Sequence, residues 1–187
     1  MRLKNRIEHM DVQQNSRASA PVSGKHSIMQ LPFVTELIAL ANILVYIILS
    51  FGGATEDAFY MASRGAMYPE FLTINHQWWR LLTAMFLHFG VAHLMNNMVI
   101  FCCVGSRLEK YIGHWKMAVV YFAAGIGGGL LSYIMMLLSG NYAVSGGASG
   151  AVFGVIGGLL GVIIAMAIVI IIYLTNDTIK VEEDVER

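Results

Sequence analysis

Residues 145–174 read SGGASGAVFGVIGGLLGVIIAMAIVIIIYL, and this stretch decides the fold. From Ser149 to about Leu174 it contains no charged residue. A helix needs about 20 consecutive apolar residues to cross a hydrocarbon core roughly 30 Å thick. The stretch therefore predicts a membrane-spanning helix over residues 149–174, entered through a turn rich in glycine.

Three further apolar runs, at about residues 33–51, 81–104 and 117–138, are also long enough to span a bilayer. Of the 187 residues, 57% are hydrophobic and 13% are charged, and the mean hydropathy is +0.63, which is typical of membrane proteins. We therefore predict an all-α membrane protein, a polytopic helical bundle with about four spans. One membrane domain over residues 33–175 is expected between a flexible tail at 1–32 and an acidic tail at 176–187.

The positive charges predict how the spans are oriented. Ten of the 12 Lys and Arg residues fall in the two tails and in the turn between the second and third spans. The connection after the first span has only Arg64 and Arg80, and the loop before Ser149 has none. By the positive-inside rule, both termini are expected in the cytoplasm of a multi-pass protein, with the bacterial inner membrane as its expected location.

Composition also excludes several kinds of site. The formal net charge is zero and no basic stripe is present, so no nucleic-acid partner is expected. No zinc-ligand spacing, phosphate-binding loop or acidic ligand cluster occurs, so we expect no metal and no cofactor. The only two cysteines, Cys102 and Cys103, are adjacent in an apolar run and are not expected to pair with each other in an ordinary disulfide.

The turn before the last span has two interpretations. Ser149 is a candidate nucleophile, because its small neighbours let a carbonyl group approach and a helix N-terminus favours developing negative charge. Alternatively, the sequence Gly-Ala-Ser-Gly lets two membrane helices pack closely. The turn alone does not decide between these two roles.

Two polar residues of the second span bear on this choice. His93 and Asn97 are four residues apart and so lie on one face of a helix. The second and fourth spans both enter from the outer side, so these side chains and the Ser149 N–H can converge. They would then form an oxyanion hole, worth about 3 kcal/mol per donor in a transition state. The alternative is that they only bridge helices, usually for less than about 2 kcal/mol.

Several motifs, taken together, resemble one protein family. They are W-W-R at residues 78–80, H-F-G-V-A-H-L-M-N-N at 88–97, G-S-R-L-E-K at 105–110 and G-G-A-S-G at 146–150. Their order and spacing, from about Phe59 to Gly161, are similar to those of the rhomboid intramembrane serine proteases. The resemblance implies hydrolysis of a peptide bond in or next to a transmembrane segment, through an acyl-enzyme, without metal or cofactor.

The resemblance also assigns roles to residues. It implies Ser149 as the nucleophile, and His93, Asn97 and the Ser149 amide as oxyanion donors. Substrate binding and organisation of the site fall to Gly147, Gly150 and His88. Trp79-Arg80 would belong to a structured first loop, and Glu109 would brace the cytoplasmic end.

The chain departs from the family pattern in one respect. Rhomboids have at least six spans, and their general base is a histidine on the sixth, whereas no histidine follows His114 here. We therefore expect the general base to be absent and the chain to be C-terminally truncated. His76, His88 and His93 are weaker candidates for a replacement base.

Three functional hypotheses follow. The first is a rhomboid protease that is incomplete in this chain, its site completed by self-association or by a second chain. The second is a catalytically inactive rhomboid-like pseudoprotease that binds membrane clients. The third is a channel or transporter component whose intramembrane His and Asn line a pathway. In the first two, the partners are transmembrane proteins and the lipid bilayer.

Overall fold

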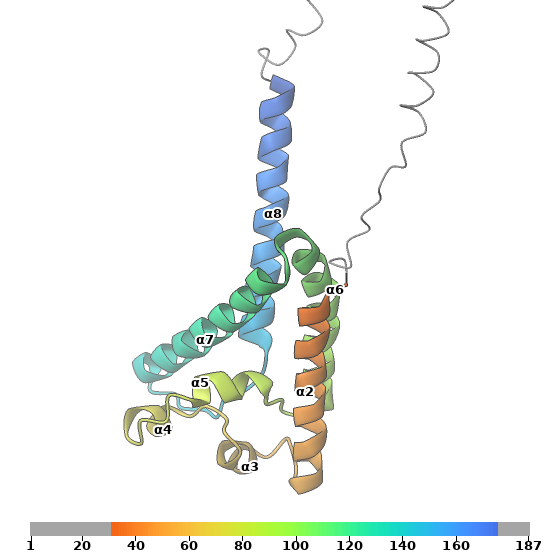
Figure 1. The fold of residues 1–187 in the computed structure, drawn as a ribbon. Coiled ribbons are helices and arrows are strands. Elements are labelled where there is room, and N and C mark those ends of the chain that lie inside the picture. Colours follow the sequence, from red (N-terminus) through yellow and green to blue (C-terminus); the bar gives the residue numbers. More distant parts are fainter. Residues whose placement is uncertain (1–30, 176–187) are drawn as a thin grey trace, which may run out of the picture.

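The computed structural model describes residues 31–175. The predicted tails at 1–32 and 176–187 therefore lie outside the described residues, except for residues 31 and 32. Four long helices carry the fold, and short helices gather at one end of it (Figure 1). The elements in chain order are α2 (Phe33–Gly52), α3 (Ala58–Ser63), α4 (Pro69–Thr73), α5 (Arg80–Thr83), the 3-10 turn η2 (Ala84–Phe86), α6 (Val91–Ile112), α7 (His114–Ser139) and α8 (Ser149–Thr175).

All four long helices are long and apolar enough to cross a membrane. The prediction of an all-α membrane protein with about four spans is confirmed. The second span differs in detail, because its continuous helix begins at Val91 rather than near residue 81. Leu87 is extended and Gly90 has a φ of +83°, so the chain changes direction between η2 and α6. A left-handed φ of this kind favours glycine.

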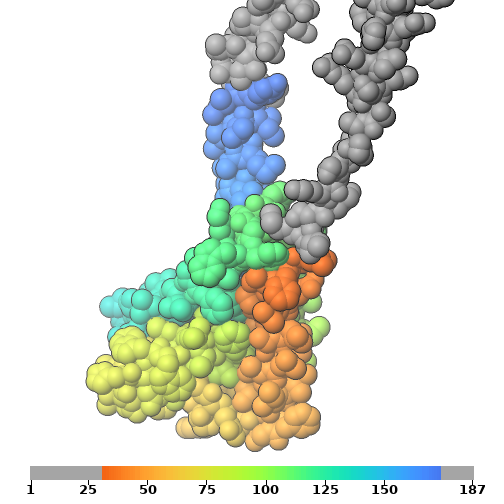
Figure 2. Space-filling model, in the orientation of Figure 1, coloured from red at the N-terminus to blue at the C-terminus, as the bar shows by residue number. Residues whose placement is uncertain are grey.

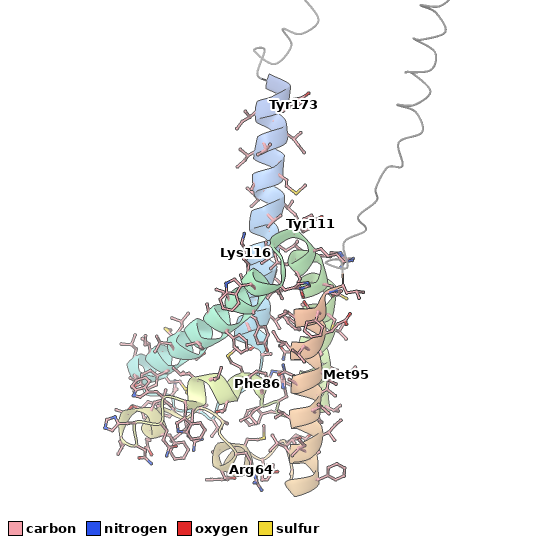
Figure 3. The ribbon with its side chains drawn as sticks, viewed as in Figure 1. Arg64, Phe86, Met95, Tyr111, Lys116 and Tyr173 are labelled. Atoms are coloured by element: carbon pink, nitrogen blue, oxygen red, sulfur yellow. The ribbon has the colours of Figure 1, made fainter. Side chains whose placement is uncertain are left out.

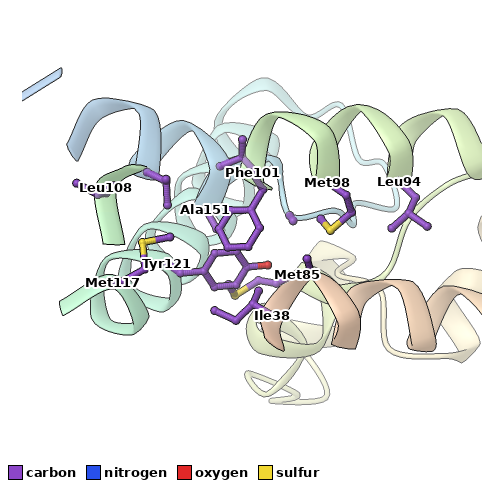
Figure 4. Packing of buried hydrophobic residues seen from close by; sticks show 13 residues of the cluster. Ile38, Met85, Leu94, Met98, Phe101, Leu108, Met117, Tyr121 and Ala151 are labelled. Carbon is purple, nitrogen blue, oxygen red and sulfur yellow. The ribbon is translucent and has the colours of Figure 1, made fainter. Parts of the chain in front are cut away.

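The main core lies where α2, α6, α7 and α8 meet (Figure 4). Phe101 of α6 and Tyr121 of α7 are both fully buried, with ring centroids 5.0 Å apart. Asn42 of α2 reaches the same place and donates from Nδ2 to the Tyr121 hydroxyl at 3.3 Å and to the Ile38 carbonyl at 2.8 Å. Tight aromatic and methionine packing thus joins these spans. Hydrogen bonds satisfy the Asn42 amide nitrogen, whereas its Oδ1 is buried without a partner among the described residues.

Helices α7 and α8 cross at small residues. A Cβ placed on Gly128 of α7 would lie 3.1 Å from the Cα of Gly150, and one placed on Gly154 would lie 2.1 Å from the Cβ of Ala124. Close approach of two backbones requires such residues. The Gly-Ala-Ser-Gly sequence therefore packs helices through Gly150 and also places Ser149 at a helix start, so the two interpretations of the turn are compatible.

Glu109, near the C-terminal end of α6, joins this helix to α2 and α7. It is only 2% exposed and accepts hydrogen bonds from the Val34 N–H at 2.9 Å and the Thr35 N–H at 2.8 Å. It also accepts from the Thr35 hydroxyl at 2.5 Å and pairs with Nδ1 of His114 at the start of α7. A carboxylate here satisfies free N–H groups at the start of α2 and complements the helix dipole.

Arg80 organises the connection between α2 and α6. Its Nη1 donates to the carbonyls of Ala62 and Ala66, both at 2.7 Å, and its Nε donates to Oε1 of Gln77 at 2.6 Å. The guanidinium also lies over the rings of Phe71 and Trp79, at 4.2 and 4.9 Å from their centroids. Burial lowers the pKa of Arg80 from its ordinary value. One buried cation thus ties together a loop whose own buried hydrophobic side chains form two small clusters.

We expect the substitution Arg80→Lys to destabilise this connection. A lysine has no planar fork to reach two carbonyls and stack on two rings. The loss should be about 2 kcal/mol of unfolding free energy, the scale of a hydrogen bond to a charged group. Faster proteolysis within residues 53–90 would show it. The matched control is Arg64→Lys, since Arg64 is exposed and its guanidinium stacks on Tyr60. Equal effects of the two changes would contradict the role of Arg80.

Candidate active site

The segment that leads into Ser149 is fixed by backbone hydrogen bonds. Met67 and Ser145 form an antiparallel bridge, each donating its N–H to the other's carbonyl at 2.8 Å. Gly147 then donates its N–H to the carbonyl of Ala84 at 2.8 Å. Since Arg80 binds the carbonyl of Ala66, the loop and the segment before Ser149 are held as one unit.

His88 holds the next residue of this segment. It is fully buried, and its Nε2 accepts a hydrogen bond from the Ala148 N–H at 3.3 Å. Burial, with a smaller effect of His93, lowers the pKa of His88 to about 4. The ring is therefore neutral at neutral pH and keeps a lone pair to accept this bond. His88 acts directly on the backbone next to Ser149.

His93 lies against the same turn. A Cβ placed on Gly147 would lie 2.7 Å from Cε1 and 2.8 Å from Nε2 of the His93 ring, and Gly147 has a φ of +130°. The rings of His93 and His88 meet edge to face, with centroids 5.2 Å apart. Only glycine gives the ring this room and this backbone conformation. The structure thus brings the predicted residues His93, His88 and Gly147 together.

Asn97 lies one turn further along α6. It is buried, and its Nδ2 donates to the carbonyl of His93 at 3.0 Å. Its amide thus lies on the face of α6 that carries His93, as the four-residue spacing predicts.

Ser149 is the first residue of α8 and is exposed. Within residues 31–175 its hydroxyl makes no hydrogen bond. The Val152 N–H bonds to the carbonyl of Ala148, so the preceding N–H groups of the first turn are left without helical partners. An open hydroxyl at the positive end of a helix, on a turn whose two residues before Ser149 contact imidazoles, suits a reaction in which negative charge develops.

The other predicted residues make different contacts. Gly150 contacts the backbone of α7, as described above. His114 pairs with Glu109 at the opposite end of α6, and His76 is exposed in the connection between α4 and α5. In the part of the chain that the structure describes, no group of three or more His, Cys, Asp or Glu side chains is placed to hold a metal ion.

Three contacts were not anticipated from the sequence. They are the Met67–Ser145 bridge, the Gly147–Ala84 hydrogen bond and the binding of Glu109 by Thr35. The first two are backbone contacts between distant segments, which residue patterns do not reveal. The third had one available signal, a threonine in the first turn of an apolar helix.

Comparison with known proteins identifies the family. The family model described as "Rhomboid domain" matches residues 75–177, more than half of the chain. The chain belongs to the rhomboid family. Its similarity to the rhomboid protease GluP of Bacillus subtilis is 33% identity over 120 residues. Similarity extends to RHOMBOID-like protein 2 of Arabidopsis thaliana, with 39% identity over 87 residues, and to Rhomboid-like protease 3 of Toxoplasma gondii, with 39% over 117.

The matches cover 64%, 46% and 61% of this rhomboid chain, respectively. They cover only 22%, 26% and 42% of the three relatives. The chain therefore spans less than half the length of each relative. It is a multi-pass membrane protein of a family of intramembrane proteases.

Proposed function

We propose that this chain carries the nucleophile and the oxyanion-binding part of a rhomboid intramembrane serine endopeptidase. Ser149 would attack a peptide carbonyl in or next to the transmembrane segment of a substrate protein. The observation that supports this most strongly is the position of Ser149, exposed at a helix start on a turn that His88 and His93 both contact.

In the proposed reaction, the Ser149 oxygen bonds to the carbonyl carbon and the carbonyl oxygen becomes an oxyanion. His93, Asn97 and the Ser149 N–H would donate hydrogen bonds to it, each worth about 3 kcal/mol in the transition state. The C–N bond then breaks, the amine leaves with a proton, and water hydrolyses the acyl-enzyme.

This reaction needs a group that takes the proton of Ser149, because a serine hydroxyl is a poor nucleophile without one. We propose that a histidine on a further segment packs on the open side of Ser149. Both termini are proposed to lie in the cytoplasm, with Ser149 near the opposite face of a bacterial inner membrane, on the positive-charge count.

A fluorophosphonate probe tests the nucleophile. We expect it to label the wild-type protein in membranes and to leave Ser149→Ala unlabelled, since the alanine has no oxygen to phosphonylate. Mass spectrometry should find the adduct on Ser149. The matched control is Ser145→Ala, which removes a hydroxyl from the same segment while its backbone bridge to Met67 can remain. Undiminished labelling of Ser149→Ala would overturn the assignment.

A further inference from the structure

Helix α8 continues past the charged end of the bundle, which we define as Arg107, Lys110 and Lys116, where α6 ends and α7 begins. A Cβ on Gly158 would lie 3.0 Å from the Leu108 side chain, so α8 is level with this end near residue 158. Figure 3 shows Tyr111 and Lys116 at this level and Tyr173 far beyond it. Figure 2 shows the same part of α8 standing clear of the other helices.

The part of α8 beyond this level is apolar on every side. Val162 is the last α8 residue packed against the main core. The helix runs on to Thr175, a further length of roughly 20 Å at 1.5 Å per residue. The side chains of Ile163, Ile164, Met166, Ile168, Val169 and Ile170 are each between 50% and 64% exposed. A helix without a polar face is normally surrounded by apolar groups, not by water.

If α8 is straight, the charged end of the bundle cannot lie at the membrane surface while residues 163–170 stay in the bilayer. Lysine and arginine are expensive in hydrocarbon, so the charged end should lie at the membrane surface. The straight helix would then carry residues 163–170 into water. The conflict disappears if α8 bends where it leaves the bundle.

Glycines lie where α8 leaves the bundle. Gly157, Gly158 and Gly161 lie within about one turn of the level of Leu108. A Cβ on Gly157 or Gly161 would meet nothing within 4 Å, so close packing does not require glycine at either position. Glycine weakens a helix interior relative to alanine, and kinks occur at such positions.

We propose that α8 bends over Gly157–Gly161 in the membrane, so that residues 163–170 lie among the acyl chains of the leaflet next to the charged end. The apolar surface has no single stripe, whereas pairing of two helices needs only one. Lipid therefore covers it better than a second copy does.

Cysteine accessibility tests whether lipid surrounds residues 163–170. In a Cys102→Ser, Cys103→Ser background, Ile168→Cys would be reconstituted in permeabilised phosphatidylcholine vesicles and treated with a water-soluble maleimide. Val99→Cys, on the lipid-facing side of α6, is the embedded control, and Tyr111→Cys is the water-exposed control. We expect Ile168→Cys to react at least roughly tenfold more slowly than Tyr111→Cys, as Val99→Cys does, because thiolates do not form in hydrocarbon.

A photoactivatable phospholipid should also cross-link to position 168. Reaction as fast as that of Tyr111→Cys would overturn the proposal. Protection accompanied by an oxidative disulfide between two copies at position 168 would overturn the lipid assignment in favour of self-association.

The bend has a test of its own. The double substitution Gly157→Ala, Gly161→Ala fits the available space and stiffens the helix. We expect it to raise the reaction rate of Ile168→Cys several-fold towards that of Tyr111→Cys. Gly127→Ala, which also meets nothing within 4 Å, is the matched control and should leave the rate unchanged. An unchanged rate in the double variant would overturn the hinge.

Discussion

Replacing Glu109 by alanine is expected to lower the free energy of unfolding by about 3 kcal/mol, the scale of leaving buried hydrogen-bond donors unsatisfied. The Val34 and Thr35 N–H groups at the start of α2 both lose their acceptor, as does the Thr35 hydroxyl. The start of α2 also loses the negative charge that complements its dipole. Denaturant titration in mixed micelles, followed by circular dichroism, measures the loss.

Glu36 provides the matched control for this change. It lies in the same first turn of α2 but is exposed, so Glu36→Ala should change the unfolding free energy by less than about 0.5 kcal/mol. Glu109→Gln should fall between the two alanine variants, because its one amide oxygen can still accept but carries no full charge. Equal stability of Glu109→Ala and Glu36→Ala would contradict the bracing role.

The four spans were predictable because each depends on a local property, the length of an apolar run. The runs at Phe33 and Ser149 begin where helices begin in the structure. The predicted start of the second span was wrong, because residues 81–90 are as apolar as a membrane-spanning helix. Apolar side chains occur both in membrane-spanning helices and in buried connections. Composition therefore cannot distinguish a spanning helix from the buried α5–η2 segment. The left-handed Gly90, with Phe89 before it, was the available signal.

The candidate site was predictable to the extent that it depends on helical spacing and on motifs. His93 and Asn97 share a face of α6 because they are four residues apart. The contact of His88 with the Ala148 N–H depends on how a loop folds against a distant turn, so residue spacing did not predict it. The family resemblance suggested only that His88 helps to organise the site. Contacts between backbone atoms, such as Met67 with Ser145, carry no residue signature.

Gly147→Ala is expected to reduce fluorophosphonate labelling of Ser149 by roughly tenfold or more, because small displacements of catalytic groups have large effects on rate. The new Cβ would lie 2.7 Å from the His93 ring, and φ of +130° strains any residue with a side chain. Either the ring or the turn must move, and the turn leads directly into Ser149. Gly127→Ala, at an open helical position, should label like the wild type.

The two causes of this loss can be separated by a double-variant cycle on stability. Removing the ring in His93→Ala makes room for the new methyl group, so Gly147→Ala should then cost only the backbone strain, about 1–2 kcal/mol. In the presence of His93, Gly147→Ala should lower the free energy of unfolding by more. The difference between the two backgrounds measures the steric contact between the new methyl group and the His93 ring. If the cost is the same in both backgrounds, the His93 ring does not pack on Gly147. Because His93 lies in α6 and Gly147 lies in the segment that leads into α8, a positive difference would also show that α6 contacts this segment next to the proposed nucleophile.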